Sequence, residues 1–142
     1  MDYRIRKDPS ELDSTGYIEI GPGRYSGHHW QPGFLFVWED AFGMAEGLIA
    51  RHLPEYDHFG MNDIPRTTGL AIVAEWREAA AELPGLNDEA VHTRLSLDAS
   101  YRTWAGPEIA AHRPDIARLL GDLADECEVF YGQGEWICVL GM

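Results

Sequence analysis

The feature that most constrains the fold is an apolar stripe with helical spacing between residues 68 and 83. Its members recur three and four positions apart, and they are Ile72, Val73, Trp76, Ala79, Ala80 and Leu83. This spacing puts the apolar side chains on one face of a helix. Pro84 and Gly85 follow directly and end the helix, because neither residue continues one well. A helix with one apolar face must pack on another element, so the segment predicts part of a layered core.

Residues 34 to 53 form a second segment with helical spacing, and Pro54 ends it. Its apolar positions are Leu35, Trp38, Phe42, Ala45, Ile49 and Leu53. The first five residues, Phe34–Trp38, also fit a strand, because aromatic and β-branched runs suit a sheet equally well. Both interpretations stay open at this point.

Two more helices are predicted further along the chain. Asn87 is a typical N-cap for a helix that reaches Leu95, although Arg94–Leu97 alternates in polarity and a strand competes there. The last helix begins at Pro114, since proline suits a first helical turn. Its apolar stripe consists of Ile116, Leu119, Leu120, Leu123 and Cys127.

Short apolar segments near the two ends predict a small antiparallel sheet. The segment 16–20 is a strand candidate that ends at Gly21, and residues 24–30 could return as its partner. Glu128–Tyr131 and Glu135–Leu140 flank Gly132-Gln133-Gly134, a short loop of the kind that joins a β-hairpin. Residues 55–65 are rich in turn-forming residues and predict a long loop.

These elements predict an α+β fold, with residues 1–142 as a single globular domain. Three or four helices pack on a small antiparallel sheet that includes the C-terminal β-hairpin. The length of 142 residues is close to the usual size of one domain, and 45% hydrophobic residues suffice for a core. The only cysteines, Cys127 and Cys138, lie in apolar surroundings and predict buried free thiols.

The charge balance excludes several classes of partner. With 24 acidic and 11 basic residues, the chain has a formal net charge of −13. General nucleic-acid binders and proteins of anionic membrane surfaces are usually basic, so neither partner is expected. The N-terminal residues lack the apolar segment of a signal peptide, and no apolar run approaches the ~20 residues of a membrane span. A cytoplasmic protein is therefore expected.

The histidines are the candidates for chemistry. His28 and His29 are adjacent and would point to opposite faces of a strand, and no spaced His or Cys pair completes a zinc site. No metal and no cofactor are therefore predicted. His52 and His58 bracket Asp57 in a stretch that could serve general acid–base catalysis, or simply offset the dipole at a helix end.

Aromatic and acidic side chains are the candidates for binding. Tyr56 and Phe59 lie in the predicted loop, while Trp30 and Trp104 lie in polar segments, and tryptophan is enriched among binding hot spots. Residues 31–92 carry eleven acidic and three basic residues. Within that stretch the predicted helix 68–83 has one acidic side, which consists of Glu75, Glu78 and Glu82. Such a side is either simply solvated or engages a basic protein. Reversing the three to lysine is expected to leave folding nearly intact.

Three hypotheses about function follow. The first is a small acidic protein-binding module that engages a basic protein; immunity proteins and antitoxins that neutralise nucleases are one such physical type. The alternative is a small metal- or ligand-binding enzyme that uses His28, His52 and His58 with Asp57. The third is a homo-oligomeric structural protein. No nucleophile elbow or phosphate-binding loop is present to favour an enzyme.

Overall fold

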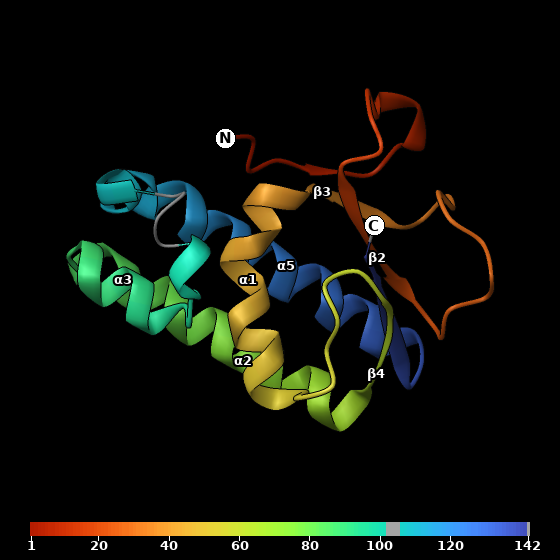
Figure 1. The fold of residues 1–142 in the computed structure, drawn as a ribbon. Coiled ribbons are helices and arrows are strands. Elements are labelled where there is room, and N and C mark those ends of the chain that lie inside the picture. The colour runs from red at the N-terminus through yellow and green to blue at the C-terminus, as the bar shows by residue number, and fades with distance from the viewer. Residues whose placement is uncertain (102–105, 142) are drawn as a thin grey trace.

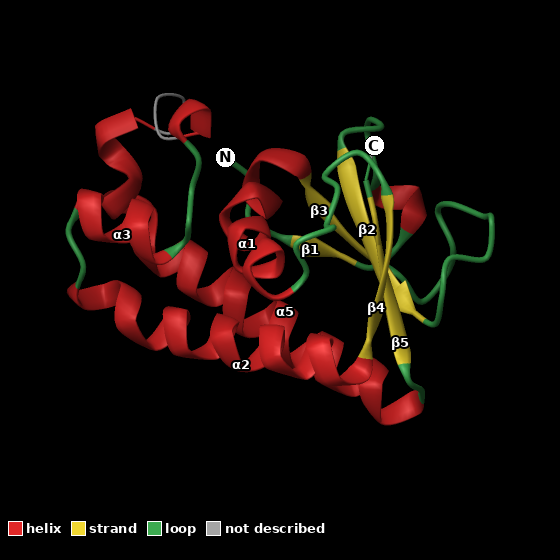
Figure 2. Cartoon of the chain, turned by 60° about the horizontal axis from the view of Figure 1, so that its bottom comes forward, coloured by secondary structure: helices red, strands yellow, loops and turns green. Residues whose placement is uncertain are grey.

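Helices cover one face of a five-stranded antiparallel sheet (Figures 1 and 2). The computed structural model describes residues 1–101 and 106–141, so Trp104 lies outside the described residues. The strand order is β1-β3-β2-β5-β4, and all neighbours are antiparallel. The strands are β1 (Ile5–Arg6), β2 (Tyr17–Pro22), β3 (Leu35–Trp38), β4 (Met61–Pro65) and β5 (Trp136–Leu140).

The main helices confirm the predicted α+β class. They are α1 (Glu39–His52), α2 (Arg66–Glu82), α3 (Asp88–Arg94) and α5 (Arg113–Gln133). Short 3-10 helices span Pro9–Glu11, Leu83–Gly85 and Gly106–His112. The predicted cap of α3 is confirmed, because the Asn87 side chain accepts a hydrogen bond from the Ala90 amide. Among the described residues, no helix combines the length and the apolar composition needed to cross a bilayer.

The core lies between the sheet and α1, α2 and α5. Trp76 of α2 is buried and donates its indole N–H to the Ala45 carbonyl of α1 at 3.2 Å. Tyr131 of α5 donates its hydroxyl to the Ile64 carbonyl of β4 at 3.0 Å. Gly69 of α2 lies so close to the Tyr131 ring that an added Cβ would come within 2.1 Å of it. These contacts hold the two longest helices together and onto the sheet.

The predicted C-terminal hairpin is wrong in its first strand. Residues 128–131 belong to α5, which continues to Gln133. Cys127, Phe130 and Tyr131 are buried and prolong the same three- and four-residue stripe, so packing of that stripe outweighs the strand preference of the aromatic residues. The strand β5 is present, and it pairs with β2 and β4 instead.

Two other segments also differ from the expected elements. Within Phe34–Trp38 the strand alternative holds for Leu35–Trp38, and α1 begins only at Glu39. The predicted loop 55–65 ends in β4, which pairs with β5 at the edge of the sheet. An edge strand tolerates proline, because the missing N–H can face outwards. Residues 24–30 form no strand.

The outer face of the sheet is covered by the segment between β2 and β3. A second apolar cluster lies there, and it consists of Tyr17, Phe34, Phe36, Cys138 and Leu140. Glu19 also lies on this face and is only 4% exposed. It accepts hydrogen bonds from the Trp30 amide at 2.7 Å and from His29 Nδ1 at 2.9 Å. The buried carboxylate therefore fastens the covering loop to the sheet.

Candidate functional site

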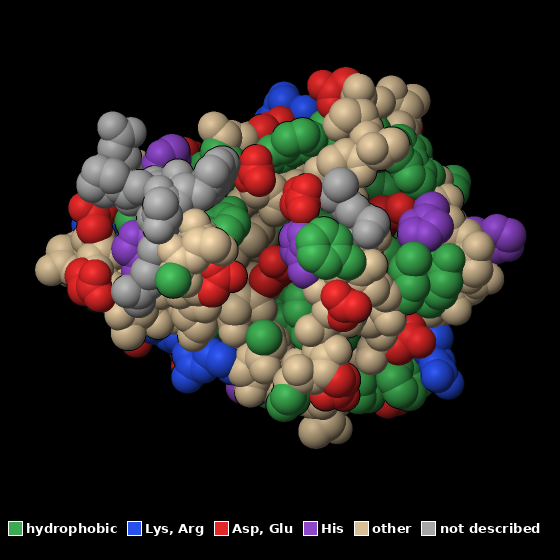
Figure 3. All heavy atoms as spheres, viewed as in Figure 1, with side chains coloured by type: hydrophobic (Ala, Val, Ile, Leu, Met, Phe, Trp, Pro, Cys, Tyr) green, Lys and Arg blue, Asp and Glu red, His purple; other side chains and the backbone are tan. Residues whose placement is uncertain are grey.

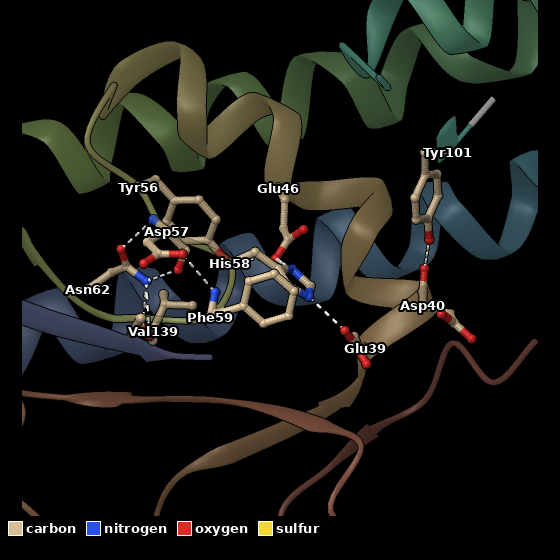
Figure 4. A network of polar contacts seen from close by, with 11 residues as sticks. Glu39, Asp40, Glu46, Tyr56, Asp57, His58, Phe59, Asn62, Tyr101 and Val139 are labelled. Carbon is tan, nitrogen blue, oxygen red and sulfur yellow. Dashed lines mark hydrogen bonds and ion pairs between the residues drawn. The ribbon is translucent and has the colours of Figure 1, made fainter. Parts of the chain in front are cut away.

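His58 lies between two carboxylates of α1 (Figure 4). Its Nδ1 is 2.6 Å from Glu46 Oε1, and its Nε2 is 2.7 Å from Glu39 Oε1. Tyr56 donates its hydroxyl to the same Glu46 oxygen at 2.9 Å. Both ring nitrogens of His58 are thus engaged by acceptors from one helix.

This geometry favours the cationic form of His58. An ionised carboxylate only accepts hydrogen bonds, and a neutral imidazole can donate only one. With Glu39 and Glu46 ionised, the two short contacts correspond to the doubly protonated, cationic ring, in keeping with the raised pKa of His58. His58 is the cation that links the loop before β4 to α1.

Burial and charge act on these groups in opposite directions. Burial by itself lowers the pKa of His58, but the hydrogen bonds and charges of Glu39 and Glu46 outweigh it and hold that pKa above its ordinary value. Burial raises the pKa of Glu46, against the opposing effects of His58 and Tyr56. Burial also raises the pKa of Tyr56 strongly, with a smaller contribution from Glu46, so this hydroxyl stays protonated and remains a donor.

Local structure positions these side chains. Glu39 and Glu46 are seven positions apart, which is about two helical turns and places them on one face of α1. Asn62 of β4 shapes the loop: its Oδ1 accepts from the Asp57 amide at 2.9 Å, and its Nδ2 donates to the Asp57 carbonyl at 2.8 Å. Nδ2 also donates to the Val139 carbonyl at 3.1 Å, which ties the loop to β5 (Figure 4).

A pocket of about 260 Å³ opens beside His58. One wall is the Glu46 side of α1, the second is the loop with Tyr56 and His58, and the third is the segment after α3 with Asp98 and Tyr101. Tyr101 donates its hydroxyl to the Asp40 carbonyl, so this third wall is also fastened to α1. Burial, with a smaller contribution from the nearby carboxylates, raises the pKa of Tyr101.

Within the described part of the chain, the carboxylates around the pocket have no arginine or lysine partner. We call the group Glu39, Asp40, Glu46, Asp57, Phe59 and Asp98 the α1 acidic surface. Among the described residues, every ion pair of these five acids is with His58. Phe59 is 69% exposed, and its ring meets the His58 ring edge-on at 4.6 Å. Figure 3 shows acidic side chains around a histidine and an apolar side chain on this face, with Lys and Arg side chains towards its margins.

The acidic side of α2, which the sequence singled out, is different. Glu75 is 3.3 Å from Arg51 of α1 and 3.3 Å from Arg94 of α3. Arg94 also contacts Glu82. Only Glu78 of the three predicted residues is exposed without an ion pair among the described residues. This part of α2 is a cross-link between three helices.

The histidines do not converge on one pocket. His28 is exposed in the loop over the outer sheet face, and His52 lies 3.4 Å from Glu75. His58 alone lines the pocket. Asp57 is exposed, and its Oδ1 accepts from the Phe59 amide at 2.9 Å, so it shapes the turn. Among the described residues, no group of three or more His, Cys, Asp or Glu side chains is arranged to hold a metal ion.

The predicted aromatic contact residues have different surroundings. Phe59 is exposed, whereas Tyr56 is partly buried with its hydroxyl on Glu46. Trp30 is exposed at 38% in a left-handed backbone conformation with φ of 60°, and its ring lies 6.3 Å from Phe36. Trp30 therefore helps to close the outer face of the sheet.

Sequence reasoning missed the partners of His58 and the third wall of the pocket. The seven-residue spacing of Glu39 and Glu46 was a usable signal, since it puts both on one helical face. No local signal connects Asp98 and Tyr101 with residues about fifty positions earlier. Comparison with protein-family models, curated proteins and solved structures finds no match for this chain.

Proposed function

We propose that this protein is a cytoplasmic binding module that engages a basic protein through the α1 acidic surface. The observation that carries the proposal is a group of carboxylates around one exposed aromatic ring, which among residues 1–101 and 106–141 have no arginine or lysine partner. Glu39 and Glu46 share a single histidine, and Phe59 projects beside it.

The physical chemistry of association supports this arrangement. Clustered negative charge attracts a positively charged partner over distance and raises its association rate. Phe59 then supplies apolar area at the centre of the contact, where burial contributes most to affinity. The carboxylates around it provide the charged rim.

An immunity- or antitoxin-type inhibitor is the specific form that we propose. A nuclease carries a basic surface because its substrate is a polyanion. A compact acidic protein with a net charge of −13 can occupy that surface in place of the substrate. The partner is then a basic protein, and no metal or cofactor takes part.

The enzyme alternative receives less support from the geometry of His58. A general acid or base needs a ring nitrogen within reach of the substrate. Both nitrogens of His58 are engaged by Glu39 and Glu46 at 2.7 and 2.6 Å. This side chain thus acts as a structural cation between loop and helix.

The proposal is tested by affinity capture from a lysate of the host organism with matched variants. D40N/F59A removes one charge and the exposed ring from the α1 acidic surface. E78Q/V129A makes the same kinds of change at an exposed acid of α2 and at Val129 of α5, which is 56% exposed.

We expect a basic protein that is captured by the wild type and by E78Q/V129A and is lost with D40N/F59A. The captured amount should also fall as NaCl is raised, because exposed charges are screened beyond about 10 Å at 0.1 M salt. Capture that is equal for both variants, or insensitive to salt, contradicts the proposal.

A further inference from the structure

We propose that the pocket beside His58 accepts the guanidinium group of an arginine side chain. The assignment rests on the proposed function in one respect, since the arginine is carried by the basic partner. The pocket has a volume of about 260 Å³ and lies between α1, the loop before β4 and the segment after α3.

Two carboxylate oxygens remain for a ligand in this pocket. Glu46 uses only its Oε1 to accept from His58 and Tyr56. Asp98 Oδ1 accepts from the Ser100 hydroxyl at 2.6 Å and the Tyr101 amide at 2.8 Å. Among the described residues, the hydrogen bonds to these two carboxylates reach Glu46 Oε1 and Asp98 Oδ1, which leaves Glu46 Oε2 and Asp98 Oδ2 for a ligand. His58 is one cation against the three carboxylates Glu39, Glu46 and Asp98, so the ligand needs N–H donors and positive charge, and an anion is disfavoured.

The tyrosines favour a planar cation. The hydroxyl of Tyr56 is committed to Glu46 and that of Tyr101 to the Asp40 carbonyl, so the aromatic ring of Tyr56 is what this wall offers a ligand. A guanidinium stacks on aromatic rings and presents several N–H groups in one plane. An ammonium is a more strongly hydrated point charge and gains less from the same walls.

The size of the pocket fits a side chain. Sites for whole small molecules usually enclose about 300–1,000 Å³. This pocket is smaller, and it lies in the α1 acidic surface where the basic partner docks. One long side chain inserted from that partner matches both facts, and arginine is enriched among such anchors.

Close backbone contacts fix two of the walls. An added Cβ at Gly47 would come within 2.3 Å of the Leu95 carbonyl oxygen, and one at Gly43 within 2.5 Å of the Tyr101 ring. The segment after α3 thus packs directly on α1. A site whose walls are already in place loses little conformational entropy when a side chain enters.

The test uses blocked arginine as a probe. Nα-acetyl-arginine N-methylamide is titrated into the ¹⁵N-labelled full chain, and the amide shifts of Gly43, Gly47 and Leu97 are followed by NMR. The citrulline analogue is the neutral isostere, and the lysine analogue carries the other cation. We expect saturable shifts with a dissociation constant of about 1 mM for arginine, which is typical of a small fragment. Binding should be at least about threefold weaker for lysine and undetectable for citrulline.

Three variants and one control locate the probe. Ala50 is exposed and lines the pocket, so A50F fills the space without changing a charge and should abolish the shifts. D98N keeps the acceptor for Ser100 and Tyr101 and should weaken binding about three- to fivefold, the range of a partly exposed charge pair. E46Q should weaken it at least as much. E78Q, an exposed acid of α2, should leave it unchanged.

Several results overturn the inference. They are equal binding of citrulline, unchanged binding in A50F and D98N, or shifts that lie outside the pocket. A variant that does not fold is recognised by its collapsed ¹⁵N spectrum, and the remaining variants then decide.

Failure of this inference is distinguishable from failure of the proposed function. If D40N/F59A abolishes capture of a basic protein but the arginine probe does not bind, the arginine site is rejected. The proposal that the α1 acidic surface binds the partner then stands. If the probe binds but capture is the same for wild type and D40N/F59A, the proposal for the α1 acidic surface is rejected. The arginine site then stands.

Discussion

The two acidic regions of the molecule look alike in sequence and differ in structure. On α2, Glu75 is 14% exposed and contacts Arg51, His52 and Arg94 from two other helices. On α1, the ion pairs that Glu39 and Glu46 form with other described residues are both with His58. The first region holds helices together, whereas the second leaves its negative charge available. Net charge therefore does not reveal where a protein is electrostatically active.

The largest effect on stability is expected when the charge of Glu75 is reversed. E75K would place a lysine against Arg51 and Arg94 at a nearly buried position. We expect a loss of about 2–3 kcal/mol in the free energy of unfolding, because two cations lose their partner and meet a third. Urea denaturation at neutral pH measures this loss.

E78K is the matched control for E75K. Glu78 is exposed on the same helix, so its reversal should change stability by less than about 0.5 kcal/mol. The structure thus revises the sequence-based expectation that all three α2 acids could be reversed with folding nearly intact. Equal effects of E75K and E78K would show that the arginine cross-link contributes nothing.

A smaller effect is expected at the centre of the α1 acidic surface. In H58Q the side chain can donate to one carboxylate but carries no charge, so Glu39 and Glu46 face each other without a cation between them. We expect a loss of about 1 kcal/mol, the range of a partly exposed charged hydrogen bond. The same urea series measures it, and a more stable H58Q would contradict the bridging role.

The pH dependence of stability tests whether His58 contributes as a cation. The pKa of this residue is raised in the folded state, so its contribution is fully present below the ordinary value of 6.5 and is lost as pH rises through the folded pKa. The difference in unfolding free energy between wild type and H58Q should therefore shrink as the pH is raised above 6.5. A difference that stays constant or grows over this range would count against a cationic His58.

The smallest effect is expected for an exposed ion pair. Arg77 of α2 contacts Asp125 at 2.9 Å and Glu128 at 2.7 Å on the surface of α5. R77A should cost about 0.5 kcal/mol, and 1 M NaCl should remove that cost. The loss in E75K should persist in the same salt. If salt reduced the losses in R77A and E75K equally, burial of Glu75 would not protect its ion pairs from screening.

The fold was predictable where neighbouring residues determine it. The stripe of α2, the Asn87 cap of α3 and the proline start of α5 are local signals, and the structure confirms them. The errors occur where local preference and long-range packing disagree. Residues 128–131 favour a strand by composition, yet Phe130 and Tyr131 are buried on α5.

The candidate site was predictable in part. Tyr56, His58 and Phe59 were singled out from their loop, and they do lie together near the pocket or on its margin. The convergence of His28 and His52 with His58 was not found. Histidine and carboxylate types suggest chemistry, but only the path of the chain decides which of them meet.

The sequence alone determined the helical stripes, the alternation of helices and strands in outline, and the acidic net charge. These follow from residue types and from spacings of three or four positions. Tertiary structure alone decided which carboxylates are neutralised. Glu39 and His58 are nineteen positions apart in the sequence, yet their side chains are in contact. The same separation holds for Glu75 and Arg94. Coulombic attraction depends on distance in space, and separation along the chain does not determine that distance.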